Sequence, residues 1–186
     1  MSFAVNDLRA NLSLGGARPT LFDVILTIPS LLQSGAPQKI QFTCQSSEIP
    51  ASKVGTIQVP YFGRMIPYPG DRTFDPWVVD IINDEDFIAR DAIENWHTLI
   101  NSRQGNVRTA GSDAPDLVMG TAIVTQYGRT GPSNILRQYI FRHIWPAQVG
   151  AIDLNWANQD SIEHFPVQFN YAWWDAVGPT VLGNES

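Results

Sequence analysis

The sequence predicts a mainly β domain of the α+β class, built as a two-sheet β-sandwich or open barrel with one α-helix on its flank. Short runs of alternating apolar and polar residues recur along the chain, separated by clusters rich in glycine, proline, asparagine and serine. One segment, residues 84–102, has the spacing of an amphipathic helix. The chain has 186 residues, 44% of them hydrophobic, and no internal repeat, so we expect a single core.

The first part of the chain is expected to form an arm, a strand, a loop and a second strand. Residues 1–16 are small, polar and without pattern, and we treat them as an N-terminal arm in front of a domain at 17–175. Alternation predicts a strand at 21–28, a loop at 29–38 and a strand at 40–45. The second strand would place Ile40, Phe42 and Cys44 on one face, with Cys44 as a small core hydrophobe.

Residues 54–66 predict a long β-hairpin. Thr56 to Val59 alternates, Pro60-Tyr61-Phe62-Gly63 forms the turn, and residues 64–66 return. Residues 68–71, with the sequence Tyr-Pro-Gly-Asp, predict a second turn in which Gly70 takes the position with φ > 0. A further strand is expected at 73–82, where tryptophan and β-branched residues are frequent.

The predicted helix begins at an acidic turn. Asp84, Glu85 and Asp86 would occupy its first turn, where the helix dipole favours negative charge. An arginine and a glutamate at i and i+4, Arg90 and Glu94, suit an exposed helix face. The apolar stripe that should face the core consists of Ile88, Ala92, Trp96 and Leu99.

The second half of the chain predicts four strands. A loop at 103–116 precedes strands at 117–127 and 135–145, and Trp145-Pro146 is expected to end the second. Tyr139, Phe141 and His143 should share one face of that strand. Residues 152–156 and 165–173 form a final pair with clean period-two alternation, and 176–186 are a C-terminal tail.

The chain shows no pattern of a catalytic, metal or cofactor site. The three histidines lack metal-ligand spacing, and neither a nucleophile elbow nor a Walker loop is present. Capping and solvation of the helix explain most of the acidic residues between 71 and 94. The tryptophans could stack on carbohydrate, but Trp77, Trp96, Trp156 and Trp173 fall on apolar stripes, which favours core or interface positions.

Charge and hydropathy restrict the partners further. The net charge of −6 argues against a protein that binds nucleic acid tightly. It is compatible with a protein that lets nucleic acid move past its surface. The single cysteine excludes an internal disulfide framework. Asp23, Pro29 and Gln33 interrupt the apolar run that begins at Leu21, so we expect no membrane insertion.

Four sequence blocks, in this order, resemble the tail tube family of contractile-tailed bacteriophages. They are Ala17-Arg18-Pro19-Thr20-Leu21-Phe22; Gly70-Asp71-Arg72-Thr73-Phe74 with Trp77 and Ile82-Asn83-Asp84-Glu85; Arg137-Gln138-Tyr139 with Ile144-Trp145-Pro146; and Ile152-Asp153-Leu154 with Trp156 and residues 162–171. Together they span nearly the whole domain, and the departures lie in the loops and termini.

The resemblance implies a structural role without enzymatic activity or cofactor. Hexameric rings, each with a continuous inner β-barrel, would stack into a hollow tube in the virion tail, assembled in the host cytoplasm. The implied partners are other copies of the chain, a contractile sheath, a baseplate, a tail terminator and double-stranded DNA passing through during ejection. A pyocin-like or type VI secretion-like tube is the alternative within this resemblance. A carbohydrate-binding β-sandwich is a third possibility.

In such a tube we expect the hairpin to carry the contacts. Tyr61 and Phe62 are too apolar for an exposed turn unless a partner covers them. Asp71 beside Arg72 is a candidate ion pair, either within the turn or between subunits. The expected inter-ring or inter-subunit residues are Tyr61, Phe62, Arg64, Asp71 and Arg72, and the expected lumen-facing residues are Thr56 and Gln58. We also expect the N-terminal arm to become ordered against a neighbouring subunit.

Overall fold

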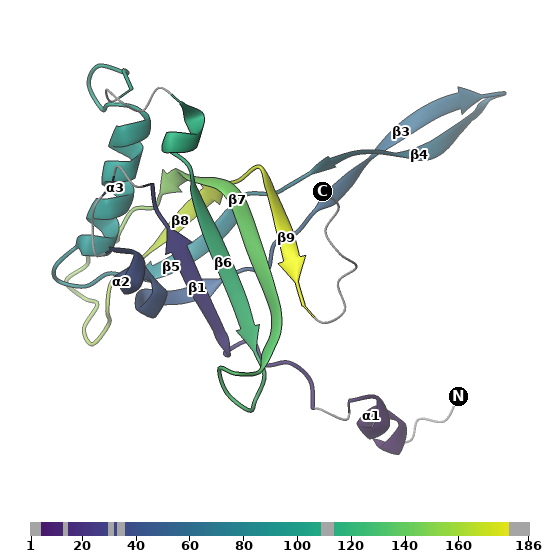
Figure 1. Cartoon of the computed structure of the whole chain (residues 1–186), viewed down its shortest axis with the longest axis horizontal. Coiled ribbons are helices and arrows are strands. Elements are labelled where there is room, and N and C mark those ends of the chain that lie inside the picture. Colours follow the sequence, from purple (N-terminus) through teal and green to yellow (C-terminus); the bar gives the residue numbers. More distant parts are fainter. Residues whose placement is uncertain (1–4, 13–14, 30–31, 33–35, 109–113, 179–186) are drawn as a thin grey trace.

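A computed structural model describes residues 5–12, 15–29, 32, 36–108 and 114–178. The predicted mainly β sandwich with a flanking helix is confirmed (Figure 1). One layer contains β1 (Phe22–Thr27), β6 (Gly120–Tyr127), the first part of β7 (Ile135–Val149) and β9 (Trp173–Val177). The other contains β2 (Cys44–Ser47), β5 (Trp77–Ile82), β8 (His164–Asn170) and the end of β7. Every strand pair is antiparallel.

The long strand β7 belongs to both layers. Its register against β6 shifts beside His143, which has a left-handed φ of 52°. This β-bulge turns the strand, so that Tyr139 and Phe141 face the core but Ile144 replaces His143 there. The expected end at Trp145-Pro146 was wrong, because β7 pairs with β8 as far as Val149. A second register shift follows Pro146, and proline is tolerated at such irregularities.

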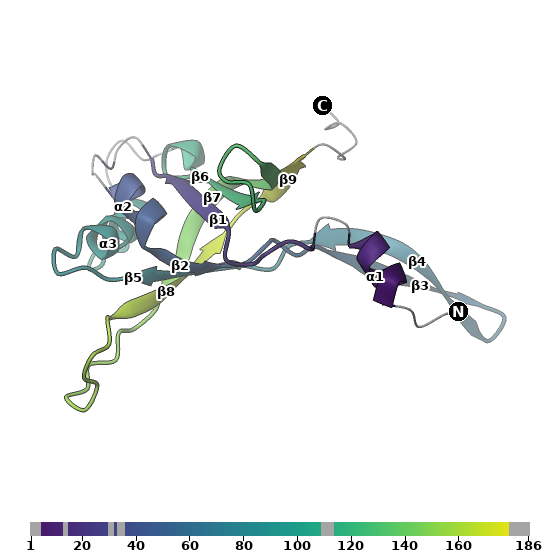
Figure 2. The same ribbon diagram turned by 90° about the horizontal axis from the view of Figure 1, so that it is seen from below.

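Helix α3 (Ile88–Ile100) closes one side of the space between the layers (Figure 2). It buries Ala89, Ala92, Ile93, Trp96 and Leu99, whereas Ile88, expected in this stripe, is exposed. The helix begins later than predicted, since Phe87 before it has a left-handed φ of 54°. Asp86 still accepts a hydrogen bond of 3.2 Å from the backbone N–H of Ile88 at the start of the helix, and both Asp84 and Asp86 form ion pairs with Lys39.

Residues 36–43 form a helix, α2 (Ala36–Thr43), and the expected strand at 40–45 was wrong. Only the short strand β2 follows it, paired with β5. Ile40 is buried, as its place on the expected apolar face predicted, but it lies in a helix rather than in a strand. A short apolar run does not distinguish a helix from a strand, and here α2 packs against β1 and α3.

Aromatic rings fill the core between the layers. The ring centroids of Trp77 and Phe141 are 4.6 Å apart, and those of Trp77 and Phe169 are 5.5 Å apart. Trp96 brings α3 into this cluster and donates a hydrogen bond of 2.6 Å from Nε1 to the carbonyl oxygen of Val118. The buried positions predicted for Trp77 and Trp96 are therefore confirmed, and neither indole is available to stack on a sugar.

The expected pair of strands at the C-terminal end is only partly present. Phe165, Val167 and Phe169 of β8 are buried, as their alternation predicted. Residues 152–156 form no strand but belong to a projecting loop at 151–163, and Trp156 is fully exposed. Beyond β8 the chain turns and forms β9, which pairs with β7 rather than continuing β8.

The N-terminal segment extends beyond the sandwich (Figure 1). The predicted arm contains a helix, α1 (Val5–Asn11), and Arg129 donates a hydrogen bond of 2.9 Å to the carbonyl oxygen of Gly15. The tail was expected from residue 176, but β9 runs to Val177. Residues 1–4, 13–14 and 179–186 of the expected arm and tail lie outside the described residues, as do 30–31, 33–35 and 109–113 of the expected loops.

Candidate assembly interface

A two-stranded hairpin projects from the sandwich, consisting of β3 (Lys53–Tyr61) and β4 (Arg64–Thr73) (Figures 1 and 2). It is longer than predicted, because 68–71 is not a turn but continues β4 through a bulge beside Gly55. Gly70 has no positive φ. Position 70 favours glycine because there is little room for a side chain. A Cβ atom there would lie 3.1 Å from Ile57 Cγ1 and 3.2 Å from the carbonyl carbon of Gly55.

The hairpin tip is a two-residue turn. Tyr61 pairs with Arg64, and the two residues between them, Phe62 and Gly63, have φ values of 42° and 78°. Positive φ at both central positions is the signature of a type I′ turn, which matches the twist of the flanking strands. Phe62 is 90% exposed, and its ring makes an edge contact with Tyr61 at 4.7 Å between centroids. A bulky apolar residue in a strained, exposed turn indicates a functional contact.

The two faces of the hairpin differ in character. Cross-strand pairs Ile57–Tyr68, Val59–Ile66 and Tyr61–Arg64 share one face, which is apolar apart from Arg64. The opposite face carries the pairs Thr56–Pro69, Gln58–Pro67 and Pro60–Met65. All twelve side chains are exposed. Thr56 and Gln58, the expected lumen-facing residues, thus lie together on the face without the apolar row.

The predicted contact residues fall into two groups. Tyr61, Phe62 and Arg64 lie together at the tip. Asp71 and Arg72 lie at the other end of β4, roughly 25 Å away at about 3.3 Å per residue. Both side chains are exposed, and within the described residues they form no ion pair with each other. An ion pair between them that fixes the turn, one of the two alternatives expected from the sequence, is therefore not formed. Their part in subunit contacts stays a prediction.

The sandwich itself has open sheet edges. In the part of the chain that the structure describes, β1 pairs only with β6, β2 only with β5, and β9 only with β7. Each therefore presents a row of unpaired backbone groups on its outer side, which is a template for pairing with another strand. Together with the hairpin, these edges leave the subunit with surfaces that other chains can complete.

The described residues contain no group of three or more His, Cys, Asp or Glu side chains that could hold a metal ion. The histidines lie apart: His97 is hydrogen-bonded to the carbonyl oxygen of Pro146, whereas His143 and His164 are near Asp116 and Asp80. Burial raises the pKa of the Cys44 thiol to about 12, which fits the expected inert core position. In the same residues no helix is long and apolar enough to span a membrane.

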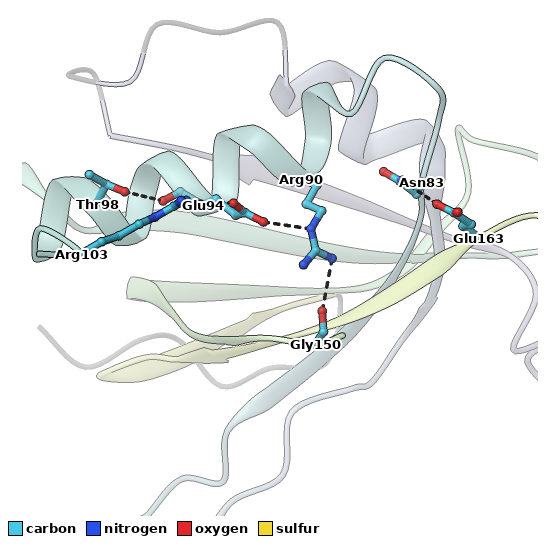
Figure 3. Close-up of polar contacts among 7 residues, drawn as sticks. All are labelled: Asn83, Arg90, Glu94, Thr98, Arg103, Gly150 and Glu163. Carbon is cyan, nitrogen blue, oxygen red and sulfur yellow. Dashed lines mark hydrogen bonds and ion pairs between the residues drawn. The ribbon is translucent and has the colours of Figure 1, made fainter. Parts of the chain in front are cut away.

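Polar contacts hold α3 on the sandwich (Figure 3). The predicted pair of Arg90 and Glu94 is confirmed at 2.9 Å, and Arg103 binds the second carboxylate oxygen of Glu94 at 2.9 Å. Arg90 also donates a hydrogen bond of 3.2 Å to the carbonyl oxygen of Gly150, just beyond β7. These arginines are therefore engaged in structural contacts.

The chain resembles known proteins in both sequence and structure. The family described as phage tail tube protein matches residues 17–177. Tail tube protein gp19 of Enterobacteria phage T4 is 34% identical over 159 residues, covering 86% of this chain and 91% of that protein. The tail tube protein of Serratia phage KSP90 is 26% identical over 172 residues, covering 90% and 93%.

Two solved structures share the fold. A chain in the cryo-EM structure of the anti-feeding prophage baseplate superposes with a TM-score of 0.62 at 9% identity, covering 89% of this chain and 98% of that one. A chain in the sheath-tube complex of the PVC extracellular contractile injection system has a TM-score of 0.55 at 12% identity, covering 95% and 99%. At these identities the likeness establishes the fold alone.

Proposed function

This chain belongs to the phage tail tube protein family, and from that membership we propose that it is a structural subunit of the tail tube of a contractile-tailed phage. Hexameric rings of the subunit stack into a hollow tube, which conducts DNA during ejection. The tube is assembled in the host cytoplasm, surrounded by a contractile sheath, and bounded by a baseplate and a terminator in the virion tail. The role is structural and requires no cofactor.

The observation that carries this proposal is the projecting hairpin. An isolated two-stranded hairpin is at best marginally stable in water. Here it exposes the row formed by Ile57, Val59, Ile66 and Tyr68, and a phenylalanine at its tip. Burial of apolar surface against another copy would stabilise this conformation. The hairpin is thus best explained as an element that adjacent rings share.

The open edges suit a ring. When one edge strand pairs with a different edge of the next copy, the contact is heterologous, and it forms a closed ring if the rotation closes. If each of the subunits in a hexamer contributes ~4 strands, strand spacing and tilt give an inner barrel roughly 45–50 Å across at the backbone. That width leaves room for a DNA duplex inside.

The charge distribution suits a channel that does not bind DNA tightly. The chain has two lysines, and both are paired: Lys39 with Asp84 and Asp86, and Lys53 with Asp75. Because DNA affinity comes mainly from clustered basic side chains on phosphates, a subunit of net charge −6 with neutralised lysines lets DNA slide. We place Thr56 and Gln58 on the lumen side, where uncharged side chains would line the path.

Substitutions at the hairpin tip test the proposal. The Tyr61→Ser/Phe62→Ser variant should fold normally, since both side chains are exposed, but should no longer polymerise. Thr56→Ser/Gln58→Ser on the opposite face is the matched control and should form tubes. Negative-stain electron microscopy and sedimentation report the outcome. Tubes of normal length from the tip variant would reject the assigned role of the hairpin.

A further inference from the structure

We propose that the loop at residues 151–163, between β7 and β8, is the docking site for the hairpin tip of a second copy of this chain. This receptor loop projects from the sandwich away from the hairpin (Figures 1 and 2). The proposal rests on the tube function and identifies the surface that the hairpin meets.

The receptor loop exposes apolar side chains that the fold leaves uncovered. Trp156 is 100% exposed and Leu154 is 81% exposed, and Ile162 is also largely in water. Tryptophan is among the residues most enriched in the energetically dominant parts of protein interfaces. Three large apolar side chains on one projecting loop therefore indicate a binding surface rather than the scattered exposure of an ordinary protein surface.

The loop is also hollow. Between its two limbs lies an open hollow of about 680 Å³, lined by Ile152, Leu154, Trp156 and Ile162 among others. Pockets that bind small molecules measure about 300–1,000 Å³. The hairpin tip presents two aromatic rings in edge contact, Tyr61 and Phe62, and the hollow is large enough to receive them.

The two surfaces carry opposite charge. Residues 151–163 contain Asp153, Asp160 and Glu163 and no basic residue. The basic residue at the hairpin tip is Arg64, whereas Lys53 pairs with Asp75 and Arg72 lies beside Asp71 at the other end of β4. Arg64 lies beside the tip and, among the described residues, has no acidic partner of its own. Complementary charge around an apolar contact favours encounter and selects the orientation.

The stem of the receptor loop is anchored on the sandwich. Gly150 donates a backbone hydrogen bond of 2.7 Å to Pro166, and Arg90 binds the carbonyl oxygen of Gly150. On the other limb, Asn83 donates from its backbone to the Glu163 carbonyl oxygen at 2.8 Å and from its side chain to the Glu163 carboxylate at 3.0 Å (Figure 3). A site held at both limbs loses less conformational entropy when it binds.

The positions of the two surfaces prevent contact within one subunit. The tip and the receptor loop lie at opposite ends of the subunit in both views (Figures 1 and 2). A subunit cannot satisfy its own receptor loop in this arrangement, whereas a head-to-tail stack satisfies one pair at every step. Such a heterologous contact propagates without limit, as a tube of stacked rings requires.

The test uses the full-length protein in three forms. The loop variant Leu154→Ser/Trp156→Ser should form rings but no tubes. Its matched control is Gln159→Ser, an exposed polar residue of the same loop that does not line the hollow, which should form tubes of normal length. Mixing the loop variant, which keeps its tip, with Tyr61→Ser/Phe62→Ser, which keeps its receptor loop, should give a discrete complex of two rings by analytical ultracentrifugation and no tubes.

A labelling experiment reports on the receptor loop while its exposed apolar side chains are kept. In Ser161→Cys, maleimide should modify the introduced thiol at least tenfold more slowly in tubes than in rings of the same protein carrying the tip substitutions. Tubes from the loop variant, no complex in the mixture, or equal labelling rates would overturn the docking site while leaving the tube function standing. Failure of the unmodified protein to form any tube would instead reject the proposed function.

Discussion

Replacing Trp96 by phenylalanine should destabilise the subunit more than any comparable change at the surface. Trp96 is fully buried on α3, at the point where the helix meets the aromatic core. Its indole Nε1–H also donates a hydrogen bond of 2.6 Å to the carbonyl oxygen of the buried Val118. Phenylalanine keeps the aromatic contact but removes both the donor and the five-membered ring.

The expected loss has two components. A buried carbonyl left without its donor costs about 1–3 kcal/mol. The atoms missing from the ring contribute about 1–2 kcal/mol more through lost burial and the cavity that remains. A total of about 2–5 kcal/mol is a large share of a typical unfolding free energy of about 5–15 kcal/mol. It corresponds to a fall in melting temperature of about 5–15 °C for a domain of this size.

Urea unfolding followed by circular dichroism measures this loss. The measurement belongs in the Tyr61→Ser/Phe62→Ser background, because polymerisation would add stability that depends on concentration. Trp156→Phe is the matched control: the same substitution at a fully exposed site should change the free energy of unfolding by less than about 0.5 kcal/mol. A loss below about 1 kcal/mol for Trp96→Phe, or equal losses for both, would refute this account of the core.

Three further predictions concern single positions. Gly120→Ala would place a Cβ atom 2.3 Å from the carbonyl oxygen of Thr27, and calorimetry should show a loss of about 1–3 kcal/mol; unchanged melting would mean that β1 and β6 separate easily. Hydrogen bonding to Lys39 lowers the pKa of Asp84, so this pair stabilises the fold above the usual carboxyl pKa near 4 and ceases to do so as pH falls through the lower folded value. The melting temperature of Lys39→Met should therefore lie below that of the parent at pH 7 and equal it in strong acid; a difference that persists in acid would contradict the ion pair. Burial raises the pKa of Cys44 to about 12, so a disulfide reagent at pH 8 should modify the folded subunit far more slowly than the urea-unfolded chain, and equal rates would contradict the burial.

Elements with a long, regular pattern could be predicted from the sequence. Phe165, Val167 and Phe169 alternate without interruption, and each is buried in β8. Trp96 and Leu99 likewise follow helical spacing onto the core. In such segments one face is apolar and the other polar, so local periodicity and burial agree, and only one register hides the apolar face.

Hairpin existence and tip composition were also predictable, because turn chemistry is local. The expected turn at Pro60-Tyr61-Phe62-Gly63 was too long, because Pro60 and Tyr61 belong to β3 and only Phe62 and Gly63 form the turn; the exposed aromatics there predict a partner. The length of the hairpin was not predictable. Pro69 and Gly70 have the composition of a turn, yet here they belong to a bulged strand that, among the described residues, pairs with β3 alone.

Tertiary structure decided the remaining features. Residues 152–156 alternate as regularly as a true strand, but they pair with no strand among the described residues, and the segment became the receptor loop with Trp156 in water. Helix α2, which contains Ile40, packs against α3 and β1, and the bulge at His143 carries β7 from one layer to the other. The sequence by itself determined which side chains are apolar and at what spacing. Whether such a stripe is covered by the same chain or by another copy depends on contacts between distant segments, because periodicity contains no information about the partner.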